Sequence, residues 1–554
     1  MKKLTHWLVL PLLGAIGMLP TRAAVWQWSH EVTSIALGQG EAHPRAFLWI
    51  PPDCRRVRAV VFGQNNMIEE GILEHPVFRN TLAQLGIAEL YVAPTFGTWQ
   101  DATNNAGTNA KFTALLQALA TDSGYGELAQ APIVVLGHSA MASFPWNFAA
   151  WNPERTLAIL SVHGDAPQTT LVGNGHPNVD WRSRSIDGIP GLMVMGEYEW
   201  WEDRLTPALA FRAKHPNAAV ALLGDEGHGH FDYSGQLVRF LAMFIRKAAE
   251  QRLPDEAPLD GRVVLKPVDP RRGWLVDRWR PHELPRARAS AFATYAGDRR
   301  EAFWCFDREM ARATEEFNPQ HGKRPQLVGF VQAGKVVPHT PKTHAQVFLK
   351  LSPLGDALTF RLQGAFLDVV PPGNNPAKWT GLTNGAPLGH AAGGGPVVLS
   401  RISGPVRQLA PDTFAIRFNR SSMAADRRAG DIWLLANQPG DAHYKSAVQQ
   451  GLLTIPMRLT DGAEQHINFP PISDQPAGTK KIKLNATSDA GAPVYYYVRE
   501  GPAEVDGNLL RFTSLPPRTQ WPVQVTVVAW QYGRTVEPKL QSAKPVEQTF
   551  LIKE

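Results

Sequence analysis

Cysteine is almost absent from this chain of 554 residues, which contains only Cys54 and Cys305. Two thiols are too few for a cysteine-based metal centre, because such sites usually take several cysteines. The long separation of the two residues along the chain says nothing about their distance in space. The sequence leaves two alternatives open: a disulfide, which an exported protein can form, or two isolated buried thiols.

A strong excess of charge of either sign is also absent. Lysine and arginine together number 56, aspartate and glutamate 50, and the formal net charge is +6. No dense block of basic residues occurs, whereas nucleic-acid-binding proteins concentrate positive charge. We therefore expect no nucleic-acid partner. Loss of Lys2, Lys3 and Arg22 with the N-terminal segment described next lowers the net charge to +3.

Apolar runs long enough to span a bilayer are absent after the N-terminus. The N-terminus itself has a basic start (MKK), an apolar stretch (LTHWLVLPLLGAIGMLP) and then small residues at positions 21 and 23. These three features are typical of a secretory signal peptide. We predict a signal peptide over residues 1–23, cleavage after Ala23, and a secreted or periplasmic protein.

Residues 24–254 alternate apolar strand-like segments with amphipathic helical segments, in a chain long enough for two to four domains. This alternation predicts an α/β domain with a doubly wound, mostly parallel sheet and helices on both faces. The expected strands lie at 46–50, 58–63, 90–94, 133–136, 157–162, 191–195 and 220–223, and the expected helices at 111–120 and 236–250.

Composition changes near residues 253–258, and the chain beyond is richer in proline, glycine and strand-like runs. We predict a β-rich middle domain of unknown role over residues 255–465, with one helix within 300–316 and strands at 345–351, 358–362 and 414–418. Residues 466–554 contain short apolar runs at 494–498, 509–512, 523–530 and 546–552, separated by turn residues. Such spacing predicts a β-sandwich.

The last part resembles the bacterial Ig-like modules found at the ends of exported proteins. The resemblance rests on QHINFPPISDQ, APVYYYVREGPAEVDGN and the final EQTFLI. It implies an Ig-like β-sandwich that spaces the rest of the protein or attaches it to a glycan or a cell surface. No residue of this part marks a binding pocket.

The stretch VVLGHSAMASF, residues 134–144, runs from an apolar strand through Gly137 to Ser139 and then into small residues that open a helix. A serine on such a turn is held above the sheet edge, and the helix N-terminus directs its dipoles at an anion that forms there. The N–H of Ala140 is then one expected oxyanion donor. The alternative is that Ser139 only caps a buried helix.

This arrangement resembles the α/β-hydrolase superfamily, in particular serine esterases and dienelactone-hydrolase-like proteins, over residues 24–254. The family's nucleophile elbow, G-x-S-x-G, corresponds to Gly137 through Met141, and Met141 departs from the small residue preferred at the last position. The resemblance implies a nucleophile Ser139, followed along the chain by an acid and then a histidine.

The acid is expected after a later strand. Residues 191–199, GLMVMGEYE, form such a strand and end in Glu199, three residues past a glycine. That spacing resembles the family's G-x-x-D, so Glu199 is the first choice. The alternatives are Glu197, Glu202, Asp203 and, after the preceding strand, Asp165.

The histidine is expected between the last strand and the final helix, where the chain reads GDEGHGHFD. We choose His230, because Gly-His-Phe before a helix is the commoner pattern in the family, and keep His228 as the alternative base. The second oxyanion donor is expected in the loop after the 58–63 strand. The backbone N–H groups of Asn65 and Gln64 are the candidates there.

Residues 228–232 (HGHFD) also match H-x-H-x-D, a spacing that dinuclear metallohydrolases use. That family needs a further histidine directly after the aspartate, where this chain has Tyr233, and needs the motif early in the chain. We therefore expect no metal, and the serine chemistry requires no cofactor.

Together these features predict an exported hydrolase that cleaves carboxylic esters, on carbohydrate or aromatic polymers. Trp200 and Trp201 directly follow the acid and are candidates for the substrate pocket, because tryptophan stacks on sugars and packs on acyl groups. Three alternatives stay open: a peptidase, a metallohydrolase, and a non-catalytic hydrolase-like protein that binds glycans or surfaces.

Overall fold

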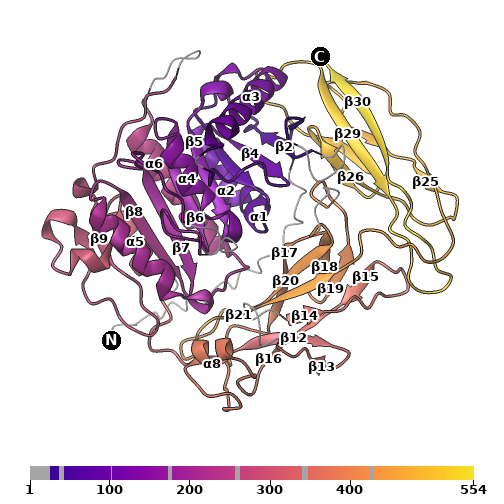
Figure 1. Ribbon diagram of the computed structural model, residues 1–554. Helices are drawn as coiled ribbons and strands as arrows, with labels where there is room; N and C mark the ends of the chain where they lie inside the picture. Colours follow the sequence, from indigo (N-terminus) through magenta and orange to yellow (C-terminus); the bar gives the residue numbers. More distant parts are fainter. Residues whose placement is uncertain are drawn as a thin grey trace, which may run out of the picture.

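A computed structural model describes residues 25–35, 43–101, 103–171, 178–255, 262–317, 319–339, 347–422 and 428–554. The expected signal peptide, residues 1–23, lies outside the described residues. Figure 1 shows an α/β part on the left, a group of small sheets below it, and a strand-rich C-terminal part on the right. Within the described ranges, no helix has the length and apolar character to cross a membrane.

The N-terminal part is built on one sheet of eight strands in the order β1-β2-β4-β3-β5-β6-β7-β8. β2 is antiparallel to both neighbours, and all pairings from β4 to β8 are parallel. The predicted mostly parallel sheet is therefore confirmed. Its strands are β1 Trp28–Glu31, β2 Arg45–Trp49, β3 Ala59–Gln64, β4 Ile87–Ala93, β5 Ile133–His138, β6 Thr156–Val162, β7 Pro190–Gly196 and β8 Ala219–Asp225.

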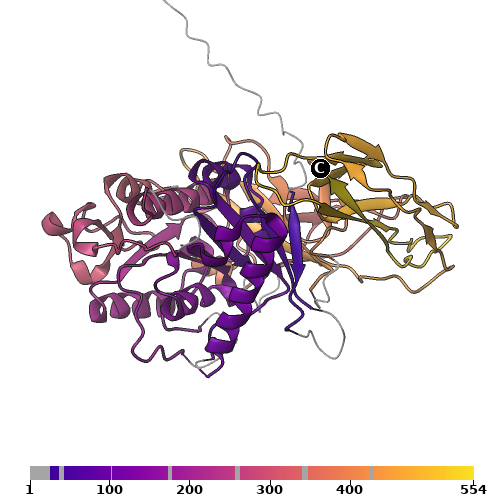
Figure 2. The same cartoon turned by 90° about the horizontal axis from the view of Figure 1, so that it is seen from above.

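Helices cover both faces of this sheet, as Figure 2 shows. Consecutive strand residues point to opposite faces, so Val61 and Val134 pack with one set of helices, and Val60 and Val135 with the other. Burial of both faces explains why the central strands are almost continuously apolar. The first set is α1 Glu69–Leu73, α2 Pro76–Leu85 and α6 Gly235–Arg252; the second is α3 Asn105–Ser123, α4 Phe144–Trp151 and α5 Glu202–Lys214.

The segment from β9 to α7 packs on the α/β part. β11 lies beside β8, and Trp304 and Met310 belong to the same hydrophobic cluster as Leu241 of α6. The helix expected within residues 300–316 is α7, which starts after Asp307 caps the Met310 N–H (3.0 Å). The elements here are β9 Trp274–Asp277, β10 Ser290–Ala291, β11 Ala302–Cys305 and α7 Arg308–Glu315.

The rest of the middle region forms three small sheets and one short helix, α8 Asn374–Thr380. One sheet joins β13 Lys335–Val336, β12 Val328–Gln332 and β16 Gln363–Phe366. A second joins β14 Val347–Leu349, β21 Ala447–Thr454, β20 Asp431–Gln438 and β17 Val398–Ser403. The third joins β15 Thr359–Arg361, β19 Thr413–Ile416 and β18 Val406–Ala410. The middle region is β-rich, as predicted.

The C-terminal part is a sandwich of a four-stranded sheet, β23-β30-β29-β26, and a three-stranded sheet, β24-β28-β27. Val525, Phe550 and Leu510 lie between the two sheets. On the outer face of the larger sheet, Tyr497 and Trp530 pack into the core of the middle region. The Ig-like identity stays a prediction. The strands are β22 Ile467–Asn468, β23 Gln475–Pro476, β24 Lys481–Lys483, β25 Thr487–Ser488, β26 Tyr495–Glu500, β27 Ala503–Asp506, β28 Leu509–Phe512, β29 Val523–Trp530 and β30 Val546–Lys553.

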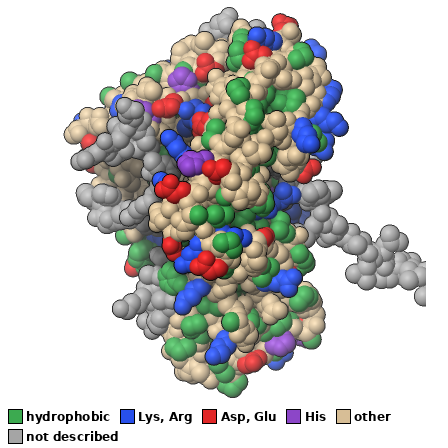
Figure 3. All heavy atoms as spheres, turned by 90° about the vertical axis from the view of Figure 1, so that its right-hand side faces the viewer, with side chains coloured by type: hydrophobic (Ala, Val, Ile, Leu, Met, Phe, Trp, Pro, Cys, Tyr) green, Lys and Arg blue, Asp and Glu red, His purple; other side chains and the backbone are tan. Residues whose placement is uncertain are grey.

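The two cysteines are free and buried in different clusters. Burial raises the pKa of the Cys54 thiol to about 11 and that of Cys305 to about 12. Of the two alternatives left open by the sequence, the structure therefore has two isolated thiols. The face shown in Figure 3 carries basic and acidic side chains interspersed with apolar ones, in keeping with the small net charge.

Candidate active site

Ser139 lies directly after β5, on a sharp turn into the short helix Ser139–Met141. Its φ is 53°, in the left-handed region that a residue with a Cβ rarely occupies. Gly137 permits the turn, since a Cβ there would lie 2.1 Å from the Met141 carbonyl oxygen. Met141, the departure from the family pattern, is accommodated because its side chain packs in the core beside α3 and α4.

The structure brings Ser139, His230 and Glu199 together from the loops after β5, β8 and β7. Ser139 Oγ lies 2.6 Å from His230 Nε2, and Glu199 Oε2 accepts a hydrogen bond from His230 Nδ1. The serine is 8% exposed. A hydroxyl, an imidazole and a carboxylate connected in this order form the hydrogen-bonded chain that serine hydrolases use.

The Glu199 carboxylate has three further partners. Its Oε1 accepts from His163 Nδ1 (2.6 Å) and from the Gly196 N–H (2.9 Å), and its Oε2 accepts from an Arg204 Nη (3.0 Å). Burial alone would raise its pKa, but the Arg204 guanidinium and the two imidazoles hold the pKa of Glu199 well below its usual value. The acid is therefore a carboxylate at neutral pH.

His163 and Arg204 are site residues that the sequence reasoning missed. His163 follows the last residue of β6, and side chains at the carboxyl ends of parallel strands meet at one sheet edge. Its position directly after a strand is the feature from which the sequence could have predicted its place in the site. Arg204 lies in the first turn of α5 and carried no such signal.

Burial lowers the pKa of His230, with the Arg204 charge acting in the same direction, while Glu199 partly opposes them. His230 is thus neutral at pH 7 and can accept a proton. Burial also acts to lower the pKa of His163, but its contacts with Glu199 outweigh burial and raise the pKa. Although both rings contact Glu199, His230 therefore favours its neutral form and His163 is easier to protonate than a free imidazole.

His228 lies in a different environment. Its Nδ1 is 2.5 Å from Asp232 Oδ2. Although burial opposes protonation, Asp225 and Asp232 raise the pKa of His228 to about 9, so this ring is a cation at neutral pH and a poor base. The two histidines therefore contact different carboxylates. The described part of the chain contains no group of three or more His, Cys, Asp or Glu residues that could hold a metal ion.

The middle region anchors the histidine loop through two buried contacts. Gln450 of β21 donates to Asp232 Oδ1 (2.8 Å), and Asp232 also accepts the Gly229 N–H (2.8 Å). Lys445 Nζ donates to Glu197 Oε1 (2.7 Å). The other carboxylate oxygen of Glu197 accepts the Gly227 N–H (2.8 Å). Glu197, one of the alternative acids, is therefore a structural bridge between the two parts.

The other alternative acids also have other contacts. Asp203 accepts a hydrogen bond from Trp201 Nε1 (2.8 Å) at the surface. Glu202 accepts from Arg278 (2.9 Å). Asp165 is buried, and its carbonyl oxygen accepts from the indole of Trp146 (2.8 Å).

Of the two expected oxyanion donors after β3, Asn65 has its N–H occupied in the sheet. The Asn65 N–H donates to the Val92 carbonyl in the sheet (2.8 Å), so the expectation that it receives an oxyanion is wrong. The side-chain amide of Gln64 is buried and holds the next loop, accepting from the Phe96 N–H (2.7 Å) and donating to the Gly97 carbonyl (2.7 Å). The expectation for the Gln64 backbone N–H stays a prediction. Ala140 lies in the first turn after Ser139, where N–H groups lack an intrahelical partner.

Glu69 connects the loop after β3 to the nucleophile turn. One carboxylate oxygen accepts the His138 N–H (2.9 Å), and the other accepts the N–H groups of Asn66 (3.1 Å) and Met67 (2.8 Å). Burial raises the pKa of Glu69 to about 7. This carboxylate fixes the distance between two backbone segments that flank Ser139.

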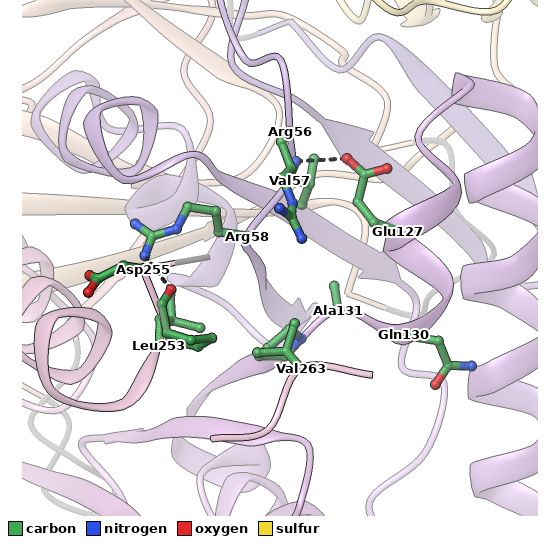
Figure 4. A pocket seen from close by; sticks show the side chains of 11 residues that line it. Arg56, Val57, Arg58, Glu127, Gln130, Ala131, Leu253, Asp255 and Val263 are labelled. Atoms are coloured by element: carbon green, nitrogen blue, oxygen red, sulfur yellow. Dashed lines mark hydrogen bonds between the residues drawn. The ribbon is translucent and has the colours of Figure 1, made fainter. Parts of the chain in front are cut away.

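A cavity of about 170 Å³ borders this site on the side of Glu199 and His230. Trp200 and Trp201 both line it, as do residues of α8. A second hollow, shown in Figure 4, lies at the opposite, amino ends of the strands, before β3 and β5. There Glu127 accepts the Val57 N–H (3.0 Å) and Arg58 donates to the Pro254 carbonyl (3.4 Å), so its polar groups serve the fold.

A central sheet in this strand order, with a strained serine after β5 and an acid and a histidine after β7 and β8, is the arrangement of the α/β-hydrolases. The N-terminal part has the α/β-hydrolase fold. No protein-family model matches the chain, and no curated protein matches it.

Several solved structures are similar to the α/β-hydrolase part. An S-formylglutathione hydrolase from Agrobacterium tumefaciens is 16% identical with a TM-score of 0.30, over 40% of this chain and 93% of that chain. A truncated carbohydrate esterase from gut microbiota is 12% identical with a TM-score of 0.30, over 41% and 98%. A dienelactone hydrolase from Anabaena variabilis is 16% identical with a TM-score of 0.25, over 40% and 95%.

The contact between Gln450 and Asp232 predicts that the middle region positions the base. Replacing Gln450→Leu removes a donor to a buried carboxylate. We expect the unfolding free energy to fall by about 1–3 kcal/mol and kcat on an ester to fall about tenfold, because the histidine loop shifts.

The matched control is Gln438→Leu, which removes another buried glutamine whose partners lie outside the histidine loop. It should lower the melting temperature and leave kcat unchanged. Equal kcat in the Gln450→Leu variant and the wild type would contradict the positioning role.

The Arg204 charge predicts a pH effect. Because it lowers the pKa of both Glu199 and His230, Arg204→Met raises both pKa values. His230 works as a base only when unprotonated, so the acid limb of kcat/KM moves to higher pH, by roughly one pH unit. Arg204→Lys keeps the charge and should leave the limb near its wild-type position. An acid limb that stays fixed or moves to lower pH in the methionine variant would disprove this assignment.

Proposed function

We propose that this protein is an exported serine hydrolase that cleaves carboxylic esters. The observation that carries the proposal is the chain of hydrogen bonds from Ser139 through His230 to Glu199, set on a strained turn at the edge of the sheet. Strain at a residue with a Cβ persists only where the surrounding structure enforces it, and such residues cluster at active sites.

In the first step, His230 accepts the proton of Ser139 as Oγ attacks the ester carbonyl. The Ala140 N–H and the dipoles of the turn after Ser139 stabilise the oxyanion that forms. Glu199 orients His230 through Nδ1 and stabilises the imidazolium. The imidazolium then protonates the leaving alcohol, and an acyl-serine remains.

In the second step, His230 takes a proton from water, and the hydroxide attacks the acyl-serine. Collapse of the second tetrahedral intermediate returns the proton to Ser139 and releases the carboxylic acid. His163 and Arg204 keep Glu199 ionised throughout, since both contact its carboxylate. All of these steps use protein groups and water.

The ester substrates that we propose are those of carbohydrate or aromatic polymers. Trp201 supports this class because it is 38% exposed beside the cavity next to His230, with the Arg204 guanidinium 5.4 Å from its ring centroid. An exposed tryptophan ring of this kind can pack on a sugar or an acyl group.

Export is part of the proposal and rests on the sequence features of residues 1–23. The protein purified from the producing cells should begin at Ala24, which N-terminal sequencing tests. An intact Met1 in the active protein would contradict export by this route.

The role of Ser139 predicts both loss of turnover and loss of covalent labelling. Ser139→Ala should lower kcat on p-nitrophenyl acetate by a factor on the order of 10⁴. A fluorophosphonate should label the wild type at Ser139 and leave this variant unlabelled.

The matched control is Ser143→Ala, at a buried serine one turn along the same segment. It should keep the label and most of the activity. An active wild type that resists the fluorophosphonate, or a Ser139→Ala variant that retains turnover, would overturn the proposed function.

A further inference from the structure

The cavity beside His230 is formed by two parts of the chain that are far apart in sequence. The loop after β7 supplies Glu199 and Trp201 on one side, and the first turn of α5 supplies Arg204 there. Lys378 and Trp379 of α8, in the middle region, line the other side. The cavity therefore exists only because the middle region packs against the α/β part.

We propose that this cavity is the subsite for the alcohol portion of the ester, and that this alcohol is a sugar carrying a carboxylate. The proposal rests on the proposed function and names its substrate class. In acyl transfer the histidine gives its proton to the leaving oxygen, so the leaving alcohol lies on the imidazole side of the serine. His230 borders the cavity, so the cavity lies beside the group that protonates the leaving oxygen.

Two residues that line the cavity, Arg204 and Trp379, carry buried hydrogen-bond donors without a protein partner among the described residues. Arg204 is only 3% exposed, and its Nε has no hydrogen-bond partner among the described residues. The Trp379 Nε1 is likewise buried without a partner in the described ranges. Buried donors without protein acceptors are uncommon and favour a ligand that supplies acceptors.

Lys378 adds a positive charge at the cavity. Its Nζ donates to the Trp200 carbonyl (2.5 Å) and forms no ion pair within the part of the chain that the structure describes. An ammonium has three donors, so this one contact leaves capacity for a ligand. The nearby Glu199 carboxylate is already bound to His230, His163 and Arg204. The charge left uncompensated at the cavity is positive, which favours an anion such as a carboxylate.

The rings and the size of the cavity fit a single sugar ring. Trp379 stacks on Tyr198 with ring centroids 4.8 Å apart, and both line the cavity with Trp201. Aromatic faces accept the apolar C–H face of a sugar, while donors at the rim bind its oxygens. An apolar cavity of about 150 Å³ holds one six-membered ring, and this one measures about 170 Å³.

The test compares two acetyl esters, one of methyl glucuronoside and one of methyl glucoside, acetylated at the same hydroxyl. The wild type should hydrolyse the glucuronoside ester with a kcat/KM at least tenfold higher. In the Lys378→Met variant this ratio should fall about tenfold. Lys483→Met, at an exposed lysine on β24 of the sandwich, is the matched control and should keep the wild-type ratio.

Turnover of p-nitrophenyl acetate by the wild type separates this proposal from the one on which it rests. Absence of that turnover would mean that the proposed function fails. Turnover with equal kcat/KM for the two glycoside esters, with preference for the neutral one, or with an unchanged ratio in Lys378→Met, would overturn the subsite and leave the esterase standing. Melting curves of the variants confirm that each is folded before the ratio is read.

Discussion

The candidate site depends on one buried carboxylate. Glu199 accepts hydrogen bonds from two imidazoles, a guanidinium and a backbone N–H. A buried charge is costly unless charged and hydrogen-bonding partners surround it, and here the partners come from the loops after β6 and β8 and from the first turn of α5. Each of these segments must reach the same carboxylate. Glu199 therefore holds together the loops at the carboxyl ends of the strands, where Ser139 lies.

The middle region supports this edge from outside the α/β part. Gln450 holds Asp232 and Lys445 holds Glu197, so the loop that carries His230 is braced by a strand more than two hundred residues later in the chain. α8 adds the far wall of the cavity. The β-rich region thus contacts the loop that carries His230 and forms one wall of the cavity beside it.

Local patterns in the sequence were sufficient for the sheet and the nucleophile turn, because parallel strands and strand-to-helix turns leave short-range signals. The choice of His230 over His228 rested on the family's commoner Gly-His-Phe pattern. The contributions of Arg204, Glu69, Gln450 and Lys378 could not be predicted in the same way. Each acts across a tertiary contact, and a charged or amide residue on a helix or strand looks the same in sequence whether its partner is water or a buried carboxylate. The expectation for Asn65 was wrong for a related reason: sheet pairing extends one residue past β3 and occupies its N–H.

The hydrophobic clusters also cross the boundaries that composition suggested near residues 254 and 465. Trp304 belongs to the same hydrophobic cluster as Leu241, and Trp530 packs against Phe418, so a cut at either boundary would expose apolar core residues. We expect a chain with interiors joined in this way to melt as one cooperative unit. Exchange of any one part would expose apolar surface and dismantle the cavity together with the fold.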